Sequence, residues 1–361
     1  MAINTYHVIG LMSGTSLDGL DISFTRYEII DDVWSFSLLE SQSLPYTSQL
    51  KKSLQDSMHL TAFELIRFHN EYGTWLGKQV LQFIKTHKLE VDFIASHGHT
   101  VFHQPDKGVT YQIGSGQHLA NASNYKVICD FRTNDVLHGG QGAPLVPIGD
   151  QLLFGAYDYC LNLGGFSNIS YTAQQKRIAY DISPVNMMLN YLSSKIDMEY
   201  DHNGVVSQSG KIIPTLAKEL DALPYYYQSP PKSLGKEWFT EIIIPLLEQY
   251  QAPVPDLLHT ATLHIATQIS NDIKRTCTKG KTSTLFITGG GAKNSFLINS
   301  LREKIKNIAT VIIPEETIID FKEAILFGFM GVLKERNEVN CLQSVTGASR
   351  DSSSGVIFFP A

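Results

Sequence analysis

Three stretches of apolar residues separated by polar turns open the chain. Residues 8–13 and 20–24 contain mostly Val, Ile, Leu, Met and Phe, and residues 36–44 continue an alternating pattern. Apolar positions that alternate with polar ones are typical of strands with one buried face. The pattern predicts two strands joined by a turn, followed by a third strand of the same antiparallel sheet.

The spacing of the apolar positions becomes helical after residue 61. Thr61 and Glu64 have the spacing of a capping box, in which a hydroxyl and a carboxylate satisfy the first helical N–H groups. Apolar side chains, Ile66 among them, then recur up to Ile84 and predict one long helix with a broad buried face. Further strands are predicted at 91–96, 111–113, 127–132, 160–163, 166–171, 177–181, 285–288, 310–313 and 355–359, and helices at 118–122, 186–192, 213–220, 259–274, 296–305 and 321–333.

Length and composition describe an ordinary globular protein. The 361 residues are too many for one comfortable core and favour two lobes, and 43% of them are hydrophobic against 18% charged. The formal net charge of −6 argues against general nucleic-acid binding, which requires a basic surface. No apolar run approaches the roughly 20 residues of a membrane span, and the first residues lack a signal-peptide pattern. The four cysteines are widely spaced, so we expect free thiols in a reducing, cytoplasmic environment.

The turn after the first strand is rich in small and hydroxyl residues and reads G-T-S-L-D-G at residues 14–19. Free N–H groups in such a turn can bind an anion, and Asp18 can hold a divalent cation, although an ordinary Gly/Ser-rich hairpin explains the turn equally well. A second such turn, L-N-L-G-G-F-S-N at 161–168, and a strand that runs into three glycines at 289–291 favour the binding of a nucleotide. The chain contains neither G-x-x-x-x-G-K-[ST] nor G-x-G-x-x-G, so the single-loop nucleotide folds are unsupported.

Two such hairpins followed by a glycine-rich loop resemble the duplicated ATPase architecture shared by actin, sugar kinases and the Hsp70 chaperones. The fold class predicted from this resemblance is α/β: a two-lobed actin-like ATPase (ribonuclease H-like duplicated) fold with central mixed sheets and an interlobe cleft. We expect a first lobe at 1–130, joined by the C-terminal tail 341–361, and a second lobe at 131–340.

Other candidate residues lie at predicted strand ends. Three histidines between residues 97 and 103 invite a metal interpretation, but no acidic or thiol partner follows at ligand spacing, so a loop that contacts a sugar is favoured. Asp130 and Arg132 either bind a ligand or form a surface ion pair. Asp181 precedes a predicted helix, and from position alone an N-cap role is the simpler interpretation.

Nine stretches, in family order, carry a more specific resemblance. The most specific are M-S-G-T-S-L-D-G-L-D at 12–21 and G-G-Q-G-A-P-L-V-P at 139–147, and the others lie at 96–103, 112–114, 130–132, 161–169, 231–233, 289–294 and 323–324. Together they resemble the 1,6-anhydro-N-acetylmuramic acid kinases of bacterial cell-wall recycling. This family uses ATP and magnesium to open the anhydro bridge of the sugar with water and to phosphorylate the freed oxygen, which gives the sugar 6-phosphate.

The resemblance implies a role for each matching residue. Asp181 matches the catalytic base, which takes a proton from the water that attacks the anomeric carbon. The residues implied in nucleotide binding are Gly14, Thr15, Ser16, Leu17, Asp18, Gly19, Gly164, Gly165, Asn168, Gly289, Gly290, Gly291 and Asn294, with Asp18 also holding Mg2+ through phosphates or water. The residues implied in sugar binding are Ser13, His97, Thr100, Asp130, Arg132 and Glu323, the last in the first turn of its helix.

Three positions depart from the family pattern. Ser183 and Val185 flank Pro184, where the family usually has G-P-x-N after the aspartate, and His99 stands where glutamine is commoner. These departures motivate one alternative, a kinase for another small sugar. A nucleotide-switched binding protein of the chaperone type is a second alternative. We expect ATP, Mg2+ and a small amino sugar as ligands, no nucleic-acid or membrane partner, and a homodimer.

Overall fold

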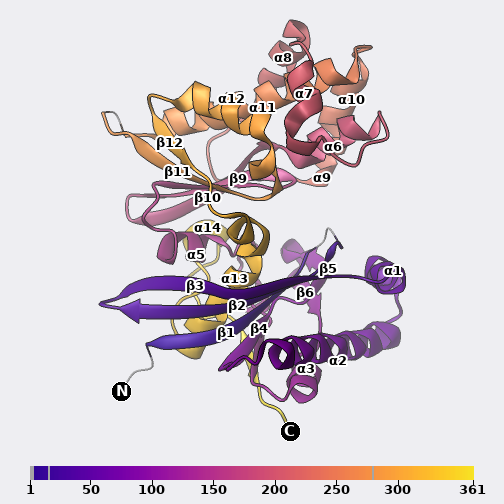
Figure 1. Ribbon diagram of the computed structural model, residues 1–361, viewed down its shortest axis with the longest axis vertical. Helices are drawn as coiled ribbons and strands as arrows, with labels where there is room; N and C mark the ends of the chain where they lie inside the picture. Colours follow the sequence, from indigo (N-terminus) through magenta and orange to yellow (C-terminus); the bar gives the residue numbers. More distant parts are fainter. Residues whose placement is uncertain (1–3, 15–16, 279) are drawn as a thin grey trace. The chain divides into compact units, whose positions relative to one another are not determined.

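The computed structural model describes residues 4–14, 17–278 and 280–361. The chain divides into two compact units: Met1–Leu153 together with Phe321–Ala361 forms unit 1, and Phe154–Asp320 forms unit 2 (Figure 1). Unit 2 is one continuous segment, whereas unit 1 is built from both ends of the chain. The lobe boundaries expected from the sequence, 130 and 341, differ from these, because residues 131–153 and 321–340 belong to unit 1.

The sheet of unit 1 has six strands in the order β13-β7-β4-β1-β2-β3. Figure 1 labels four of them, β1 to β4. β1 and β2 form an antiparallel hairpin that β3 extends, whereas β4 and β7 continue the sheet in parallel with β1. The predicted opening of three antiparallel strands is therefore confirmed. The strands are β1 (Thr5–Ser13), β2 (Gly19–Ile30), β3 (Val33–Pro45), β4 (Phe93–Ser96), β7 (Val127–Cys129) and β13 (Val356–Phe358), and β5 (His99–Gln104) pairs with β6 (Val109–Ile113) separately.

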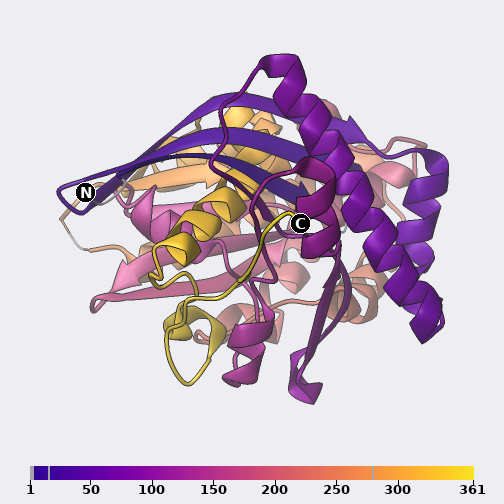
Figure 2. The ribbon, with the colours of Figure 1, turned by 90° about the horizontal axis from the view of Figure 1, so that it is seen from below.

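Helices cover both faces of this sheet. Ile9 and Leu11 of β1 share a buried cluster with Tyr72 of α2 (Ala62–His87), whereas the intervening Gly10 lies against α13 (Glu316–Glu335). α3 (Gly116–Ser123) runs beside α2 (Figures 1 and 2). Other helical segments of unit 1 are α1 (Ser48–Asp56), η1 (Ser57–His59), η2 (Pro105–Lys107), α4 (Thr133–Leu137), α5 (Pro147–Leu152) and α14 (Gln343–Thr346).

The contacts of α13 explain why it belongs to unit 1. Its backbone passes so close to β1 that a Cβ atom on Gly10 would lie 1.9 Å from the carbonyl oxygen of Ala324. The hydroxyl of Tyr27, on β2, donates a hydrogen bond to the carbonyl oxygen of Ile325 at 2.6 Å. These contacts hold the helix from Phe321 onward in unit 1, whereas its first residues, 316–320, belong to unit 2.

Two details of the predicted helices are wrong. α13 starts at Glu316 rather than at residue 321, so Glu323 lies beyond its first turn.

On α2, the predicted capping box is present, since the N–H of Thr61 donates to the carboxylate of Glu64 at 3.0 Å and the Thr61 hydroxyl accepts from the Glu64 N–H. Ile66, however, is 58% exposed, because it lies outside the face that carries Tyr72.

The sheet of unit 2 has five strands in the order β10-β9-β8-β11-β12. β8, β9 and β10 are antiparallel neighbours, and β11 and β12 continue in parallel with β8. The strands are β8 (Tyr159–Leu163), β9 (Phe166–Ala173), β10 (Lys176–Pro184), β11 (Ser283–Thr288) and β12 (Ala309–Ile312). The helical segments are α6 (Asn186–Ser194), η3 (His202–Gly204), α7 (Val205–Ser209), α8 (Pro214–Asp221), η4 (Pro224–Tyr227), α9 (Lys236–Trp238), η5 (Phe239–Ile243), α10 (Ile244–Glu248), α11 (Val254–Thr276), η6 (Gly290–Lys293) and α12 (Ser295–Ile305).

The two sheets share one strand order. When the strands of each sheet are numbered along the chain, both sheets contain the order third, second, first, fourth, fifth: β3-β2-β1-β4-β7 and β10-β9-β8-β11-β12. The glycine-rich turns therefore occupy the same place in both units, between the first and second strands. This repeated topology is the duplicated α/β arrangement predicted from the sequence.

The cysteines are free thiols, as predicted. Cys129, Cys160 and Cys341 are buried, and Cys277 is partly exposed. Burial raises the pKa of Cys129 and of Cys341 to about 12, so both thiols stay protonated at neutral pH. Across residues 4–14, 17–278 and 280–361, none of the helices has the length and apolar character that a membrane crossing requires.

Candidate functional site

The first glycine-rich turn connects β1 to β2. Thr15 and Ser16 lie outside the described residues. Leu17 has a φ of 59°, and its N–H donates to the carbonyl oxygen of Gly14 at 3.3 Å. A non-glycine residue in this region of φ marks a constrained turn. Asp18 is exposed directly after it, and Gly19 starts β2, so the carboxylate of Asp18 is open to a ligand.

Beside this turn, the end of β1 meets β5. Ser13 is buried, and its hydroxyl accepts a hydrogen bond from the hydroxyl of Tyr46 at 2.7 Å. The same hydroxyl lies 3.5 Å from Nδ1 of His99. Thr100 follows on β5 and accepts a hydrogen bond from the side-chain amide of Gln112 at 3.3 Å. Ser13 and β5 are thus neighbours in the structure, and the resemblance implies Ser13 and Thr100 in sugar binding.

His97 orients Arg132 through a defined tautomer. Its Nδ1 lies 2.8 Å from the carbonyl oxygen of Gly98, so Nδ1 carries the proton and donates it there. Nε2 is then free to accept, and it receives hydrogen bonds from Nε and Nη2 of Arg132 at 3.0 and 2.9 Å. Burial, helped by the positive charge of Arg132, lowers the pKa of His97 well below its usual value, so the ring is neutral. Nη1 of Arg132 donates to the carbonyl oxygen of Gly142 at 2.6 Å.

Asp130 and Arg132 are not partners in an ion pair. Arg132 is held by His97, whereas the Asp130 carboxylate accepts from the N–H of Thr133 at 3.3 Å. Burial lowers the pKa of Arg132, and the negative charge of Glu323 opposes this shift. Within the part of the chain that the structure describes, no group of three or more His, Cys, Asp and Glu side chains is placed to hold a metal ion.

Acidification is expected to destabilise unit 1 through His99. Burial lowers the pKa of His99 from 6.5 to about 4. As the pH falls, the unfolded chain therefore takes up this proton first, and stability that is fully present above about pH 6.5 is lost towards pH 4. His97 acts in the same direction. The variant His99→Gln should consequently lose less stability between pH 7 and pH 5 than the wild type.

Urea unfolding at the two pH values measures this difference. His59→Gln is the matched control, because His59 is exposed. An equal loss of stability in wild type and His99→Gln would contradict the assignment of the effect to His99.

The second glycine-rich turn joins β8 to β9 and is tied to the start of α6. The carbonyl oxygen of Gly164 accepts from the N–H of Asn186 at 3.1 Å, and that of Gly165 accepts from Val185 at 2.8 Å. The Asn186 side chain also donates to the carbonyl oxygen of Leu163 at 3.1 Å. The first residues of α6 thus hold the carbonyl side of the turn in place.

Asp181 lies on β10 directly opposite Asn168 on β9. The Asn168 amide donates to one carboxylate oxygen at 3.1 Å, and the backbone N–H of Leu234 donates to the other at 2.9 Å. Burial raises the pKa of Asp181, and these two hydrogen bonds oppose the shift. The N-cap residue of α6 is Val185, without a side-chain bond, so the N-cap interpretation of Asp181 is wrong.

Ser183 and Val185, which depart from the family pattern, are accommodated without loss of hydrogen bonds. The Ser183 N–H donates to the Ser167 hydroxyl at 3.0 Å, and that hydroxyl donates to the carbonyl oxygen of Ser183 at 3.0 Å. Val185 is fully buried in the core. The strand register shifts between Asp181 and Ser183, and β10 continues to Pro184 before α6 starts at Asn186.

A cavity of about 400 Å3 lies in unit 2 beside the third glycine-rich loop of the chain, at residues 289–291. Gly289 enters this loop with a φ of 81°, and a Cβ atom there would lie 2.4 Å from Oδ1 of Asn162, so the site requires glycine. Of the predicted residues, Gly290, Gly291 and Asn294 line the cavity. Asn294 is also the N-cap of α12, and its Oδ1 accepts from the N–H of Leu297 at 3.0 Å.

Sequence reasoning missed most of the other cavity walls. They comprise Asn186, Leu189, Asn190, Tyr200, Asp201, His202, Asn203, Lys293 and Glu316. The only sequence signal is the polar, glycine-bearing stretch that starts at Asp201, a composition typical of a loop. It contains η3 instead, and Asn203 accepts a hydrogen bond from the N–H of Ser295 at 3.2 Å.

The fold and these sites together define a class of protein. Each unit carries a glycine-rich hairpin turn at the same topological position, and unit 2 adds a glycine-lined cavity in the size range of small-ligand sites. This combination is a duplicated actin-like ATPase fold of the kind used by sugar kinases.

Comparison with known proteins gives the family. The family model described as anhydro-N-acetylmuramic acid kinase matches residues 6–360. A curated protein of that name from Hydrogenovibrio crunogenus is 31% identical to this chain, and the match covers 98% of each of the two sequences. A second one, from Bacillus thuringiensis subsp. konkukian, is 30% identical, and the match covers 98% of this chain and 99% of the relative. The chain belongs to the anhydro-N-acetylmuramic acid kinase family.

Solved structures are similar to this chain at much lower sequence identity. The activator of the 2-hydroxyisocaproyl-CoA dehydratase from Clostridium difficile, with bound ADPNP, gives a TM-score of 0.41 at 11% identity and covers 91% of this chain and 97% of its own. A ROK family glucokinase from Streptomyces griseus, in complex with glucose and AMPPNP, gives a TM-score of 0.37 at 8% identity. This match covers 90% of this chain and 98% of the glucokinase.

Proposed function

We propose that this protein converts 1,6-anhydro-N-acetylmuramic acid into N-acetylmuramic acid 6-phosphate, with ATP and water as co-substrates, in peptidoglycan recycling. The family match over residues 6–360, together with full-length relatives of that name, carries the proposal. The oxygen of water bonds to the anomeric carbon while the bridging C–O bond breaks. The freed oxygen at position 6 accepts the terminal phosphoryl group of ATP, and ADP leaves.

Nucleotide binding is assigned to the glycine-rich turns and to the cavity of unit 2. Backbone N–H groups of the turn at 14–19 and of Gly164 and Gly165 suit phosphate oxygens. The cavity that Gly290, Gly291 and Asn294 line suits the adenosine. Support comes from the hydrogen bonds of Asn186, which fix the β8–β9 turn next to this cavity.

Asp18 is the proposed protein ligand for Mg2+. Its exposed carboxylate is a hard oxygen donor, and Mg2+ in kinases is commonly bound by one or two carboxylates together with phosphate oxygens and water. When bound, the ion neutralises charge on the transferred phosphoryl group.

Asp181 is the proposed general base. Each of its carboxylate oxygens accepts one hydrogen bond from the protein, which leaves further lone pairs for a water molecule. Arg132, oriented by His97, offers a planar guanidinium that suits the carboxylate of the muramic acid sugar. Ser13, Thr100, Asp130 and Glu323 complete the proposed sugar-binding set.

Incubation of the pure protein with ATP, Mg2+ and the anhydro sugar is expected to yield the sugar phosphate and ADP in equal amounts. Simple hexoses in parallel reactions test the alternative of another sugar kinase. The proposal fails if no sugar phosphate forms while another family member makes it under the same conditions.

A cytoplasmic location and a homodimer remain part of the proposal. The free thiols of unit 1 and unit 2 are consistent with a reducing compartment. Light scattering of the purified protein measures the oligomeric state directly.

A further inference from the structure

A segment of unit 2 folds over the edge strand that carries Asp181. It runs from η4 (Pro224–Tyr227) through the family-matching stretch Pro231-Lys232-Ser233 to Leu234. β10 ends the sheet, and an edge strand presents backbone N–H and C=O groups that no neighbouring strand pairs. Residues 224–234, which we call the clamp, supply such partners to the backbone of Asp181.

The clamp contacts Asp181 at three points. The hydroxyl of Tyr225 donates to the backbone carbonyl oxygen of Asp181 at 2.7 Å, and the N–H of Asp181 donates to the carbonyl oxygen of Lys232 at 3.4 Å. The N–H of Leu234 donates to the Asp181 carboxylate at 2.9 Å. Between these points, Nζ of Lys232 lies 4.7 Å from the ring centre of Tyr225 and 5.7 Å from that of Tyr180. Backbone and carboxylate are therefore held by one continuous segment.

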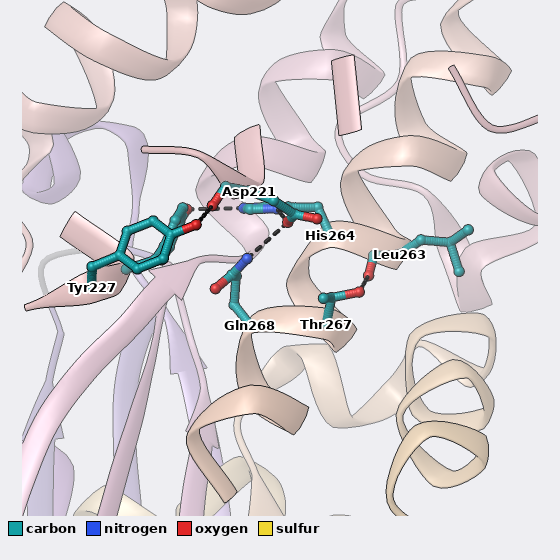
Figure 3. Close-up of polar contacts among 7 residues, drawn as sticks. Asp221, Tyr227, Leu263, His264, Thr267 and Gln268 are labelled. Atoms are coloured by element: carbon teal, nitrogen blue, oxygen red, sulfur yellow. Dashed lines mark hydrogen bonds and ion pairs between the residues drawn. The ribbon is translucent and has the colours of Figure 1, made fainter. Parts of the chain in front are cut away.

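The start of the clamp is fixed in turn by two helices. The hydroxyl of Tyr226 lies 2.9 Å from Nε2 of His264, and Nδ1 of this ring lies 2.6 Å from Oδ1 of Asp221. The same oxygen accepts from the side-chain amide of Gln268 at 2.8 Å (Figure 3). Asp221 ends α8, and His264 and Gln268 belong to α11, so η4 cannot move without breaking this network.

We propose that the clamp is a positioning element for the general base. From the open edge of the sheet, it fixes the backbone position of Asp181 and the side-chain rotation of its carboxylate. The inference rests on the proposed function and deepens it. A device of this kind is needed here, because the ladder between β9 and β10 shifts register between Asp181 and Ser183. A displacement of the base by about 1 Å can reduce turnover on the order of 10²-fold.

The first test is the variant Tyr225→Phe, with Tyr227→Phe as the matched control. Both residues belong to η4, but the Tyr227 hydroxyl donates to the backbone of Asp221 at 3.3 Å and its residue is 74% exposed. We expect Tyr225→Phe to lower kcat roughly 10- to 100-fold, with the KM for ATP within about twofold of wild type. The control should keep the wild-type kcat.

The pH profile separates positioning from a purely structural role. A carboxylate that turns away from the N–H of Leu234 loses a hydrogen bond to its charged form, so the acid limb of kcat should move up by about 0.5 to 1 pH unit.

Charged or titratable groups around Asp181 are Tyr225 and Lys232 of the clamp, and Asp272 and Arg275 of α11 behind them. β9 contributes the uncharged Asn168. Burial raises the pKa of Tyr225 far above its usual range, so its removal changes no charge in the assay.

A second variant covers the case in which Tyr225→Phe does not fold. Tyr226→Phe removes the bond between η4 and His264 without touching Asp181, and should give a smaller loss of kcat with the same shift of the acid limb. If the wild type makes sugar phosphate and both variants match Tyr227→Phe in kcat and in acid limb, the clamp has no positioning role. A wild type that makes no sugar phosphate overturns the proposed function itself.

Discussion

Replacement of Asp181 with Asn is expected to lower the rate of sugar phosphorylation by about 10²- to 10⁴-fold while the affinity for ATP stays near the wild-type value. The amide has the size of the carboxylate but cannot take a proton from the attacking water. Release of ADP in the presence of the sugar measures the rate, and calorimetric titration measures ATP binding. In the wild type, burial raises the pKa of Asp181 above its ordinary 3.8, so activity should fail on the acid side at a higher pH than an exposed aspartate would give.

Asp197→Asn is the control for this substitution. Asp197 is exposed and has a φ of 57°, a conformation that asparagine tolerates well, so its variant should keep full activity. Wild-type turnover by the Asp181→Asn variant would refute the assignment of the base. A loss of ATP binding along with the activity would indicate a nucleotide-site role instead. Sugar-independent ATP hydrolysis at an unchanged rate would favour the alternative of a nucleotide-switched binding protein.

The variant Gly10→Ala is expected to destabilise unit 1 at the upper end of the roughly 1–3 kcal/mol that overpacking costs. The added Cβ atom would lie 1.9 Å from the carbonyl oxygen of Ala324 and 2.9 Å from Oγ of Ser23. Since the first of these is a backbone atom, relief requires α13 to move away from β1. Urea unfolding of the purified variant gives the free energy of unfolding.

Gly165→Ala is the matched control for stability. The nearest atom to its Cβ would be the terminal methyl of Met187 at 3.7 Å, an ordinary van der Waals distance, so a change below about 0.5 kcal/mol is expected. Equal stabilities of the two variants would show that α13 does not pack tightly on β1.

The sequence predicted the elements whose signals are local. The capping box at Thr61 and Glu64 and the alternation along β1 and β2 depend on neighbours a few residues away, and both are present. The predicted burial of Ile66 is wrong, because helical spacing identifies a helix face but does not show how much of that face a neighbouring element covers. The expected lobe boundaries differ from those of the structure for a related reason. The contact between Gly10 and Ala324 joins residues that are far apart in the sequence and that no local pattern connects.

The motifs name some candidate residues that the structure brings together. Gly290, Gly291 and Asn294 line one cavity, and Arg132 donates hydrogen bonds to His97. The hydrogen bonds that hold Asp181 were not predictable. Leu234 contributes only its backbone N–H and Tyr225 a single hydroxyl, and neither residue type indicates such a role in a sequence.

Because unit 2 interrupts unit 1, the order of synthesis has a consequence for folding. Residues 154–320 emerge from the ribosome as one stretch and complete their own unit, while the amino-terminal strands already made still lack β13 and the part of α13 that follows Asp320. Until residues 321–361 follow, the face of β1 at Gly10 is bare, and β7 has no partner on the side that β13 covers. The half of the protein that is started first is therefore the half that is finished last, and a chain broken off before residue 321 leaves that half unfinished.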